Sequence, residues 1–489
     1  MKKIKSVLIA NRGEIAVRII KSLKKRSIKS YSIFKIGEED LPHVELADCS
    51  ICLGDGSLTD TYLNMDKIIE IAISNKIDAI HPGYGFLSEN AKFCEEVKNN
   101  NIIFIGPSSE NIVQMGDKIT SKEVAGSAGL PLVPGFNVEK ISSEEILSIN
   151  NIGYPILIKA TAGGGGKGMK LVNSEAELQE AFESAKREAL NAFNNDRVFI
   201  EKYIQSPRHV EIQVFSDSHG NHFHIFDREC SIQRRHQKII EEAPCPFITE
   251  NTRNKMIESA LKLCEKINYI GAGTVEFLVD CDQNFYFLEM NTRLQVEHPV
   301  SEFISGIDLV DTQIDVAEGK KIDLSKISKK GHAVEVRVYA EDPYNNFLPQ
   351  IGKLKLIVEK LPNNIRLDFG YKSGNTITTD FDPMIGKIIV YADSREECLM
   401  KLSTVLEKVV ILGLKTNLSF LNDIVNNDDF KKGDTLTSFI ETHQNLTKVG
   451  SDIPDPVIAA IQHIYKIDKS NSIQNTNYNL YEQFYDWRI

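Results

Sequence analysis

A glycine-rich run with two nearby lysines is the first feature of this sequence that could do chemistry. It reads Thr161-Ala-Gly-Gly-Gly-Gly-Lys-Gly-Met169, and Lys159 ends an apolar stretch just before it. Because glycine lacks a Cβ atom, such a loop can bring backbone N–H groups against phosphate oxygens, while Lys159 and Lys167 supply positive charge. It is not a Walker A loop, because Lys167 is followed by Gly168 rather than Ser or Thr. A flexible surface loop is the alternative, but the pattern favours a phosphate-binding lid.

Two glutamates lie in apolar runs that are typical of strands. Glu276 falls in Gly273-Thr-Val-Glu-Phe-Leu278, and Glu289 falls in Phe287-Leu-Glu-Met-Asn291. An unpaired carboxylate is costly to bury, so these side chains need a partner. If the strands are neighbours, both carboxylates and the Asn291 oxygen converge as hard ligands for a Mg²⁺ ion that bridges to ATP phosphates. The alternative is that each glutamate pairs with a structural arginine.

The segment after the second glutamate carries groups suited to a small anion. Arg293 can form a fork on a planar anion, and Glu297 is a candidate base a few residues along. Pro299 disfavours continuation into a helix, so we expect an irregular segment there.

A second polar run lies upstream, from Asp227 to Glu242. It is too polar for a core and too patterned for an unconstrained surface, and Gln233, His236 and Lys238 could point alternately toward a pocket. A solvated, charged strand is the competing interpretation.

The elements around these residues alternate in a way that predicts a parallel sheet wrapped by helices in the N-terminal part. Val7–Ala10 is a short apolar run, and Ile15, Ile19 and Leu23 then form one helical stripe. Asn11-Arg12-Gly13 lies where this strand passes into the helix, the place where α/β sheets open their ligand crevices. Beyond residue 330 we expect short strands and one helix near 396–409.

Composition excludes several classes of protein. The chain has 489 residues, with 57 Lys plus Arg against 68 Asp plus Glu and a net charge of −11, which argues against a nucleic-acid partner. We expect no secretory signal at the start and no membrane span, because no apolar run is long enough. Cys49 and Cys52 form the one close cysteine pair and lie in a strand-like run, so we expect reduced thiols and a cytoplasmic protein.

Seven motifs together resemble those of the biotin carboxylase family, over about residues 4–445. In chain order they are Asn11-Arg-Gly-Glu-Ile-Ala16, His81-Pro-Gly-Tyr-Gly-Phe-Leu-Ser-Glu-Asn90, Met115-Gly-Asp-Lys118, the glycine-rich run, Arg208-His-Val-Glu-Ile-Gln213, Arg234-Arg-His-Gln-Lys238 and Met290-Asn-Thr-Arg-Leu-Gln-Val-Glu-His-Pro299. The glycine-rich run occurs across ATP-grasp enzymes, whereas the strings that begin at His81 and at Arg293 are far narrower.

The resemblance implies a fold of α/β and α+β class in three parts. These are a Rossmann-like N-terminal domain over 1–116, an ATP-grasp core over 117–330 with a mobile lid at about 133–203, and a mixed C-terminal domain over 331–446. The polar tail at 447–489 is expected either to dock a partner or to be a disordered end.

The resemblance also implies the site residues. The expected ATP contacts are Lys118, Lys159, Gly165, Gly166, His209, Gln233 and His236, with Glu201, Lys202, Tyr203 and Ile204 as the adenine hinge. Glu276, Glu289 and Asn291 match the ligands of Mg²⁺ or Mn²⁺, and the two glutamates also belong to the ATP site. The expected bicarbonate and biotin residues are Tyr84, Lys238, Arg293, Gln295, Val296, Glu297 and Arg337.

The chemistry implied is stepwise, with Lys238, Arg293, Glu297 and Arg337 as the catalytic residues. Glu297 deprotonates bicarbonate, which attacks the γ-phosphate of ATP to give carboxyphosphate. Carboxyphosphate breaks down to CO₂ and phosphate, and the phosphate takes the ureido proton of biotin. Arg337 stabilises the enolate-like biotin, because developing negative charge needs a fixed cation.

The resemblance further implies partners. No Ala-Met-Lys-Met sequence occurs, so biotin is expected on a separate carrier protein, with a carboxyltransferase subunit as a second partner. A homodimer is also expected, and neither nucleic acid nor membrane is an expected partner. Arg366–Gly370 and Phe381–Ile385 favour the acyl-CoA carboxylase type, whereas the final carboxyl acceptor is not readable.

Two competing functions stay open. One is another ATP-grasp ligase that forms a carboxylated or carbamoylated product, such as the synthetase half of carbamoyl phosphate synthase, which should not respond to free biotin. The other is a catalytically silent regulatory subunit, which fits poorly because the charged site residues are all present.

Overall fold

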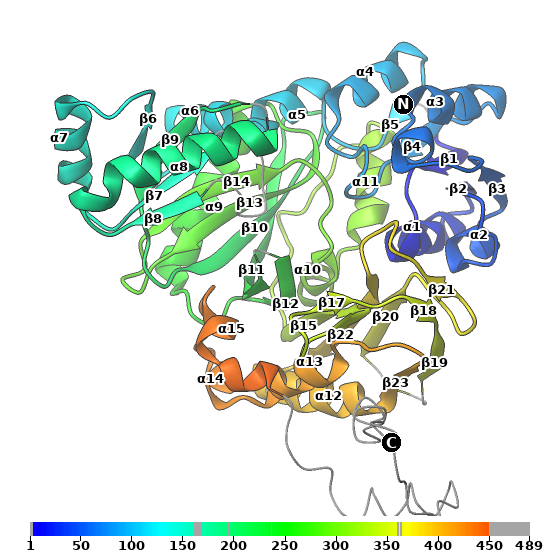
Figure 1. The fold of residues 1–489 in the computed structure, drawn as a ribbon. Coiled ribbons are helices and arrows are strands. Elements are labelled where there is room, and N and C mark those ends of the chain that lie inside the picture. The colour runs from blue at the N-terminus through cyan, green and yellow to red at the C-terminus, as the bar shows by residue number, and fades with distance from the viewer. Residues whose placement is uncertain are drawn as a thin grey trace, which may run out of the picture.

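A five-stranded parallel sheet organises the N-terminal part of this computed structural model, which describes residues 3–160, 169–193, 195–235, 237–358, 361 and 364–448. The strand order is β3-β2-β1-β4-β5, and helices pack around the sheet (Figure 1). Its strands are β1 (Ser6–Ile9), β2 (Lys29–Phe34), β3 (Cys49–Cys52), β4 (Ala79–His81) and β5 (Ile103–Phe104). Its helices are α1 (Gly13–Lys25), α2 (Pro42–Leu46), α3 (Met65–Ser74), α4 (Ala91–Asn99) and α5 (Ser109–Gly116), with a 3₁₀ turn at Leu58–Asp60.

Two local expectations for this part are confirmed. The α1 stripe of Ile15, Ile19 and Leu23 is buried against the sheet, as its helical spacing predicts. The close cysteine pair, Cys49 and Cys52, lies in strand β3, as its strand-like pattern predicts.

A smaller four-stranded sheet follows, in the order β6-β9-β7-β8, and lies at the left of Figure 1. Helix α6 (Lys118–Ser127) leads into it. The sheet and its two helices consist of β6 (Gly135–Val138), α7 (Ser143–Ile152), β7 (Ile156–Ala160), β8 (Met169–Val172), α8 (Glu175–Phe193) and β9 (Val198–Lys202). This unit has an apolar core of its own, which includes Ile158, Phe182 and Ile200. The unit spans residues 135–202, which is nearly the whole range of about 133–203 expected for the lid.

The largest sheet has eight antiparallel strands in the order β14-β13-β10-β11-β12-β15-β22-β20. Their bounds are β10 (Arg208–Ser216), β11 (His222–Arg234), β12 (Gln237–Ala243), β13 (Gly271–Val279), β14 (Phe285–Asn291), β15 (His332–Tyr339), β20 (Ile365–Phe369) and β22 (Met384–Ala392). Glu241 of β12 pairs with Glu335 of β15, so one sheet continues past residue 330. Three helices accompany its first half: α9 (Glu250–Lys266), α10 (His298–Ser305) and α11 (Leu309–Ala317).

The C-terminal part has more helices than the sequence predicts. Only one was expected, α12 (Arg395–Lys408), but α13 (Leu418–Asn426), α14 (Asp428–Lys432) and α15 (Phe439–Thr442) follow it, with a 3₁₀ turn at Gln444–Thr447. These helices are short, and Phe420, Ile424 and Phe430 are buried in the same core as α12. Packing rather than a long periodic pattern therefore stabilises them.

The remaining strands form three short ribbons. They are β16 (Glu341–Asp342) with β17 (Leu348–Pro349), β18 (Gly352–Lys353) with β21 (Thr376–Ile377), and β19 (Lys355–Val358) with β23 (Val409–Leu412).

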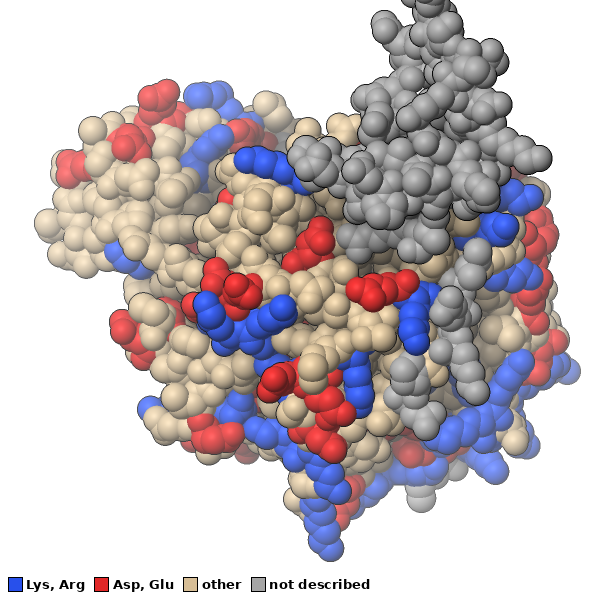
Figure 2. All heavy atoms as spheres, turned by 90° about the horizontal axis from the view of Figure 1, so that it is seen from below, with Lys and Arg blue, Asp and Glu red and all other residues tan. Residues whose placement is uncertain are grey.

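Two surface observations complete the fold. Acidic and basic side chains are interspersed over the face seen in Figure 2. Among the described residues, no helix combines the length and the apolar character needed to cross a bilayer.

Candidate functional site

The polar face of β10 is the foundation of the site. His209, Glu211 and Gln213 alternate with Val210 and its apolar neighbours Ile212 and Val214 along this strand. Because successive side chains point to opposite faces, the apolar set packs against the α9 side of the core while the polar set faces the other way. All nine residues of β10 are buried, so the polar face must be satisfied by other protein groups or by a ligand.

Three carboxylates lie side by side across neighbouring strands. Glu211 of β10 pairs directly with Glu276 of β13, and Glu276 pairs with Glu289 of β14. Directly opposed residues share a face of the sheet, so the condition set by the sequence, that the two glutamate strands be neighbours, is met. Adjacent buried carboxylates repel one another, and burial together with Glu276 raises the pKa of Glu289.

Lys238 of β12 holds this acidic group together. Its Nζ lies 2.6 Å from Glu211 Oε2, 2.9 Å from Glu276 Oε1 and 2.7 Å from Glu297 Oε1. Burial alone lowers the pKa of Lys238, but the three carboxylates raise it well above its usual range. Lys238 is therefore a charged centre that connects the expected metal side of the site with the expected base.

Glu297 is held by a second cation. Arg337 of β15 places its Nη2 at 3.1 Å from Glu297 Oε2, and it also donates from Nε to Glu241 Oε1 at 2.6 Å. Burial alone raises the pKa of Glu297, whereas Lys238 and Arg337 hold it far below its usual range. The Glu297 carboxylate is therefore ionised, and it becomes a stronger base only when a ligand takes over part of these contacts.

Polar side chains fix the orientation of Glu276. His209 Nε2 lies 2.9 Å from Glu276 Oε2, and the Asn291 and Gln295 amides donate to Oε1 at 2.8 and 2.7 Å. Gln233 hydrogen-bonds His209 Nδ1 at 2.8 Å. Although burial raises the pKa of Glu276, Lys238 and His209 hold it well below its usual range, so Glu276 is ionised and available to a cation.

Arg293 lies on the N-terminal side of this group. Its Nε donates to Glu89 Oε2 at 2.8 Å, and its Nη2 donates to Asn291 Oδ1 at 2.9 Å. Glu89 comes from the His81–Asn90 segment, so two of the motifs that resemble the family meet here. Arg293 therefore has a carboxylate partner, which the expected anion would have to replace or share.

Tyr84 is the other residue of that segment expected in the site. Its hydroxyl donates to Glu14 Oε1, at the start of α1. Glu14 Oε1 lies 3.3 Å from Nζ of Lys387, a fully buried residue of β22. Lys387 also donates to the Val296 carbonyl, between Gln295 and Glu297.

The four-stranded sheet, in the range expected for the lid, contacts α6 through a lysine–glutamate group. Glu201 of β9 is ion-paired with Lys159 of β7 and lies 2.6 Å from Lys122 of α6. Lys118, Lys122, Phe199 and Glu201 line a cavity of about 220 Å³ between α6 and the lid sheet. In the expected adenine hinge, the amides of Lys202 and Tyr203 donate to the carbonyls of Pro134 and Pro155. These two amides are therefore already used, and an adenine base would have to bind other backbone groups of the hinge, such as those of Ile204.

Three of the expected ATP contacts, Gly165, Gly166 and His236, lie outside the described residues, as does most of the glycine-rich run and all but the first two residues of the 447–489 tail.

The expected metal ligands fit a hard cation. Glu276, Glu289 and the Asn291 oxygen offer carboxylate and amide oxygens, the donor type that Mg²⁺ or Mn²⁺ takes. A further set of ligand atoms, from His209, Glu211 and Glu276, lies within 4.8 Å of one another. Lys238 already donates to Glu276 Oε1, so that oxygen is shared and Oε2 is the more available one.

The polar run from Asp227 to Glu242 corrects an expectation. It was judged too polar for a core, but Arg228, Glu229, Glu241 and Glu242 are all buried. Arg228 alone donates to Glu211, Gln213, Thr274, Gln295 and Ser301, at 2.5–3.1 Å. The interpretation as a solvated strand is therefore wrong, and pairing of charges is what allows the burial.

The helix around Pro299 corrects a second expectation, that this proline disfavours a helix. Helix α10 begins at His298, so Pro299 lies in its first turn rather than preventing a helix. Proline is tolerated there, because the first amides of a helix have no partner within it.

Several residues of this group were not expected in the site from the sequence, namely Glu14, Glu89, Glu211, Arg228, Glu241 and Lys387. Glu211 had a usable signal, since His209, Glu211 and Gln213 alternate on one strand. Lys387 had none, because only the pairing of β22 with β15 brings it near Val296.

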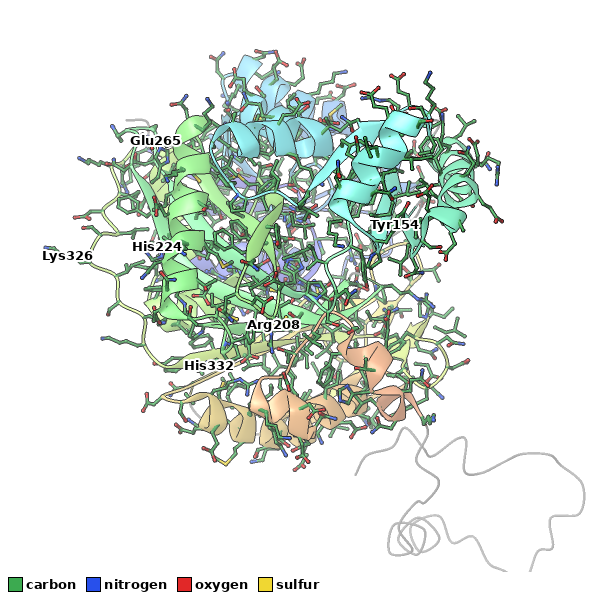
Figure 3. All side chains as sticks on the ribbon, turned by 90° about the vertical axis from the view of Figure 1, so that its left-hand side faces the viewer. Tyr154, Arg208, His224, Glu265, Lys326 and His332 are labelled. Atoms are coloured by element: carbon green, nitrogen blue, oxygen red, sulfur yellow. The ribbon has the colours of Figure 1, made fainter. Side chains whose placement is uncertain are left out.

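Arg208, labelled in Figure 3, ties the far end of β10 to the C-terminal helices. Its Nη1 donates to the Gly433 carbonyl at 2.7 Å and to Thr435 Oγ1 at 2.8 Å. This contact lies one residue from His209, so the C-terminal part supports the strand that carries the site.

Three family models match the chain in succession. Residues 3–112 match the biotin carboxylase N-terminal domain, 117–325 match the ATP-binding domain of the carbamoyl-phosphate synthase L chain, and 335–442 match the biotin carboxylase C-terminal domain.

Similar proteins include biotin carboxylase 2 of Bacillus subtilis, which is 45% identical over 441 residues, 89% of this chain and 99% of the relative. The methylcrotonoyl-CoA carboxylase alpha subunit of Rattus norvegicus is 48% identical over 444 residues, 90% of this chain but 62% of the relative. The chain thus spans somewhat less than two thirds of that longer subunit.

Solved structures of biotin carboxylases are also similar to this chain. A biotin carboxylase complex with β,γ-ATP from Campylobacter jejuni matches with a TM-score of 0.86 and 43% identity, covering 90% of this chain and 99% of that one. The biotin carboxylase domain dimer of the 2-oxoglutarate carboxylase of Hydrogenobacter thermophilus, with MgADP, ADP and bicarbonate, matches with a TM-score of 0.87 and 40% identity, covering 92% and 100%.

Proposed function

This chain belongs to the biotin carboxylase family, and we propose that it carboxylates biotin on a carrier protein, with ATP and bicarbonate as the other substrates. The observation that carries the proposal is the position of Glu297. An ionised carboxylate held by Lys238 and Arg337 lies beside an acidic group that can take a metal ion with a triphosphate. A base, fixed cations and a metal-phosphate site are what bicarbonate activation by ATP requires.

In this proposal Glu276, Glu289 and Asn291 hold Mg²⁺ or Mn²⁺, which when bound neutralises phosphate charge. Lys118, Lys159 and His209 contact the phosphates, together with Gly165, Gly166 and His236. Gln233 orients His209 through their 2.8 Å hydrogen bond. The Glu201–Ile204 hinge takes the adenine through backbone groups.

Bicarbonate binds beside Arg293, Lys238, Gln295 and the Val296 backbone. As bicarbonate enters, it takes Lys238 as a partner. The positive charge that lowers the pKa of Glu297 is then shared with bicarbonate, so Glu297 becomes a stronger base. Glu297 then removes the bicarbonate proton, and the resulting carbonate attacks the γ-phosphate to give carboxyphosphate and ADP.

Carboxyphosphate releases CO₂, the phosphate formed takes the proton from the ureido nitrogen of biotin, and this nitrogen attacks CO₂ to give carboxybiotin. Arg337 faces the negative charge that develops on the ureido oxygen. Tyr84 lies on the N-terminal side of this pocket and is proposed to border biotin. The lid keeps water from the intermediate, which would otherwise hydrolyse.

Partners and assembly belong to the same proposal. Several relatives are alpha subunits of acyl-CoA carboxylases, which supports a biotin carrier and a carboxyltransferase as partners. A domain dimer is known for the 2-oxoglutarate carboxylase relative, which supports a homodimer here.

The decisive experiment measures ADP formation with MgATP, with and without bicarbonate, and then with free biotin. We expect ADP formation to require bicarbonate and to rise on addition of biotin, with carboxybiotin as product. The match of residues 117–325 to a carbamoyl-phosphate synthase domain gives the competing function. If ADP formation did not change with biotin but rose with ammonia, the result would favour the carbamoyl-phosphate synthase type of function and overturn the proposed one.

A further inference from the structure

We infer that Lys387 is a positioning residue for bicarbonate activation, which holds the backbone of the segment that carries Glu297. The inference rests on the proposed function. Lys387 is fully buried in β22, and its Nζ donates to the carbonyl of Val296, the residue between Gln295 and Glu297. Lys387 contacts the proposed bicarbonate pocket only at this backbone carbonyl, so its effect acts through the carbonyl.

The sheet register explains why two cations act on neighbouring residues of the segment. Arg337 of β15 is the direct partner of Lys387 in β22, so both side chains lie on the same face. Arg337 binds the Glu297 carboxylate at 3.1 Å, while Lys387 binds the preceding carbonyl. The segment is thus held by side chain and by backbone at once, which limits the directions in which Glu297 can point.

The local backbone needs such support. Glu297 immediately precedes α10, and its side chain makes no capping hydrogen bond to that helix, so it is left for Lys238 and Arg337. The Gln295 carbonyl is bound by the amide and ring of His298, at 3.3 and 2.8 Å. The Val296 carbonyl lies between these two fixed points and has Lys387 as its donor.

Lys387 also connects this segment to the N-terminal part. Its Nζ lies 3.3 Å from Glu14 Oε1 and 3.9 Å from Glu335 Oε1. Glu14 accepts the Tyr84 hydroxyl, so one buried lysine joins the bicarbonate segment to the residue proposed to border biotin. An alternative role is simply to neutralise Glu14 and Glu335, and an experiment has to separate the two roles.

The test is Lys387→Met, which keeps a side chain of similar length but removes the donor. In steady-state ADP formation we expect KM for bicarbonate to rise about tenfold, the size of effect of losing one hydrogen bond from a charged group. KM for ATP should stay within about twofold, because the contacts of Lys387 are with Val296, Glu14 and Glu335 rather than with the expected metal ligands Glu276, Glu289 and Asn291. A purely neutralising role would lower Tm and leave KM for bicarbonate unchanged, which would overturn the inference.

A second variant covers the case in which Lys387→Met does not fold, since it leaves two buried carboxylates without their cation. Glu14→Gln combined with Lys387→Met removes one of those charges while the Val296 carbonyl still lacks its donor. We expect this double variant to regain Tm but not bicarbonate affinity. Recovery of both would overturn the inference.

A matched control is Arg395→Met. Arg395 also neutralises a buried glutamate, Glu242, but it donates to carbonyls of the C-terminal helices rather than to the Glu297 segment. It should lower Tm without changing KM for bicarbonate.

The wild-type protein separates failure of the proposed function from failure of this inference. If wild-type protein shows no bicarbonate-dependent ADP formation, the proposed function fails. If it does and Lys387→Met binds bicarbonate normally, only the role of Lys387 fails.

Discussion

At the scale of single residues, Glu297 shows how a site can be set up before its substrate arrives. Lys238 and Arg337 keep it ionised, which is the state a base needs, but they also reduce its affinity for a proton. A substrate anion that competes for Lys238 raises that affinity when it binds. In the proposed mechanism, Glu297 therefore takes the proton mainly when bicarbonate is present.

Replacing Glu297 by glutamine tests this role. We expect Glu297→Gln to lower bicarbonate-dependent ADP formation by about 10²-fold or more, the usual result of losing a general base. The glutamine keeps the shape of the side chain, so the MgATP-induced rise in Tm should be retained as a control. Near-normal turnover would remove Glu297 from the base role.

Lys238→Gln is expected to weaken bicarbonate use more than ATP binding, because Lys238 directly contacts Glu297 and the proposed bicarbonate pocket. The structure adds that Lys238 also binds Glu211 and Glu276, so Tm should fall as well. The check is a comparison of the two KM values at a temperature where the variant is folded. Equal rises in both would mean that Lys238 serves the phosphate side equally.

Glu229 offers a test of buried charge by pH. Burial raises the pKa of Glu229 to about 7, although Arg208 opposes this. Since the folded state then binds more protons than the unfolded chain between about pH 4.5 and 7, wild-type stability falls as pH rises through that range. Glu229→Gln lacks this titration, so its stability relative to wild type should improve by roughly 3 kcal/mol from pH 5 to pH 8, measured by thermal or denaturant unfolding.

Glu242, the direct strand partner of Glu229, is the control. Burial alone raises its pKa, but His332 and Arg395 lower it to about 2. A carboxylate with a lowered folded pKa contributes its full stability above the pKa of the unfolded chain, so the contribution is lost only below about pH 4.5. Glu242→Gln should therefore destabilise the protein already at pH 5, where the Glu242 contribution is present, and stability equal to wild type at pH 5 would contradict the assignment.

At the scale of elements, the contact of α1 with the end of β20 depends on a glycine. A Cβ atom on Gly370, just after β20, would meet the Glu14 amide nitrogen at 2.6 Å and the Gly13 Cα at 2.8 Å. Both are backbone atoms and cannot rotate away. Gly370 therefore allows α1, with Glu14 at its start, to lie against the large sheet.

Gly370→Ala should separate the two elements and destabilise the protein by about 1–3 kcal/mol, the usual cost of overpacking. The measurement is Tm, which should fall by a few degrees. Gly116→Ala is the matched control, because nothing lies within 4 Å of its Cβ position, and Tm should hardly change there. An unchanged Tm in Gly370→Ala would mean that α1 and β20 tolerate more distance than the structure implies.

At the scale of the whole molecule, three parts of the chain converge on one site. The N-terminal part supplies Glu89 and Tyr84, the central part supplies Glu276 and Lys238, and the C-terminal part supplies Arg337. A ligand that bridges such parts stabilises the folded form of all of them.

MgATP should therefore raise Tm, by an amount that corresponds to about 2.7 kcal/mol at a ligand concentration of 100 times Kd. Chelation of the metal with EDTA should reverse most of the rise, because the acidic group then faces the triphosphate without a cation. The measurement is differential scanning fluorimetry with ATP, metal and chelator in turn. A full rise with ATP in EDTA would contradict the metal role of Glu276 and Glu289.

The sequence by itself determined the family, the α/β and α+β fold class and some local elements such as α1, and these predictions are confirmed. This is possible because a helical stripe such as that of α1, or a strand ending such as that of β14, is written in residues a few positions apart. The roles of the individual site residues stay predictions. The expectation about Pro299 was wrong, as was the judgement that the 227–242 run is too polar for a core, because both depend on what packs around them.

Only the tertiary structure decided which charges meet. Lys238 and Glu297 are 59 positions apart, Lys387 and Val296 are 91 apart, and Arg18 and Glu302 are 284 apart. Contacts of that kind depend on strand order and register, which arise from the packing of the whole sheet rather than from any local pattern. For that reason the sequence could pair Glu276 with Glu289 only on the condition that their strands are neighbours, and it gave no signal for Lys387.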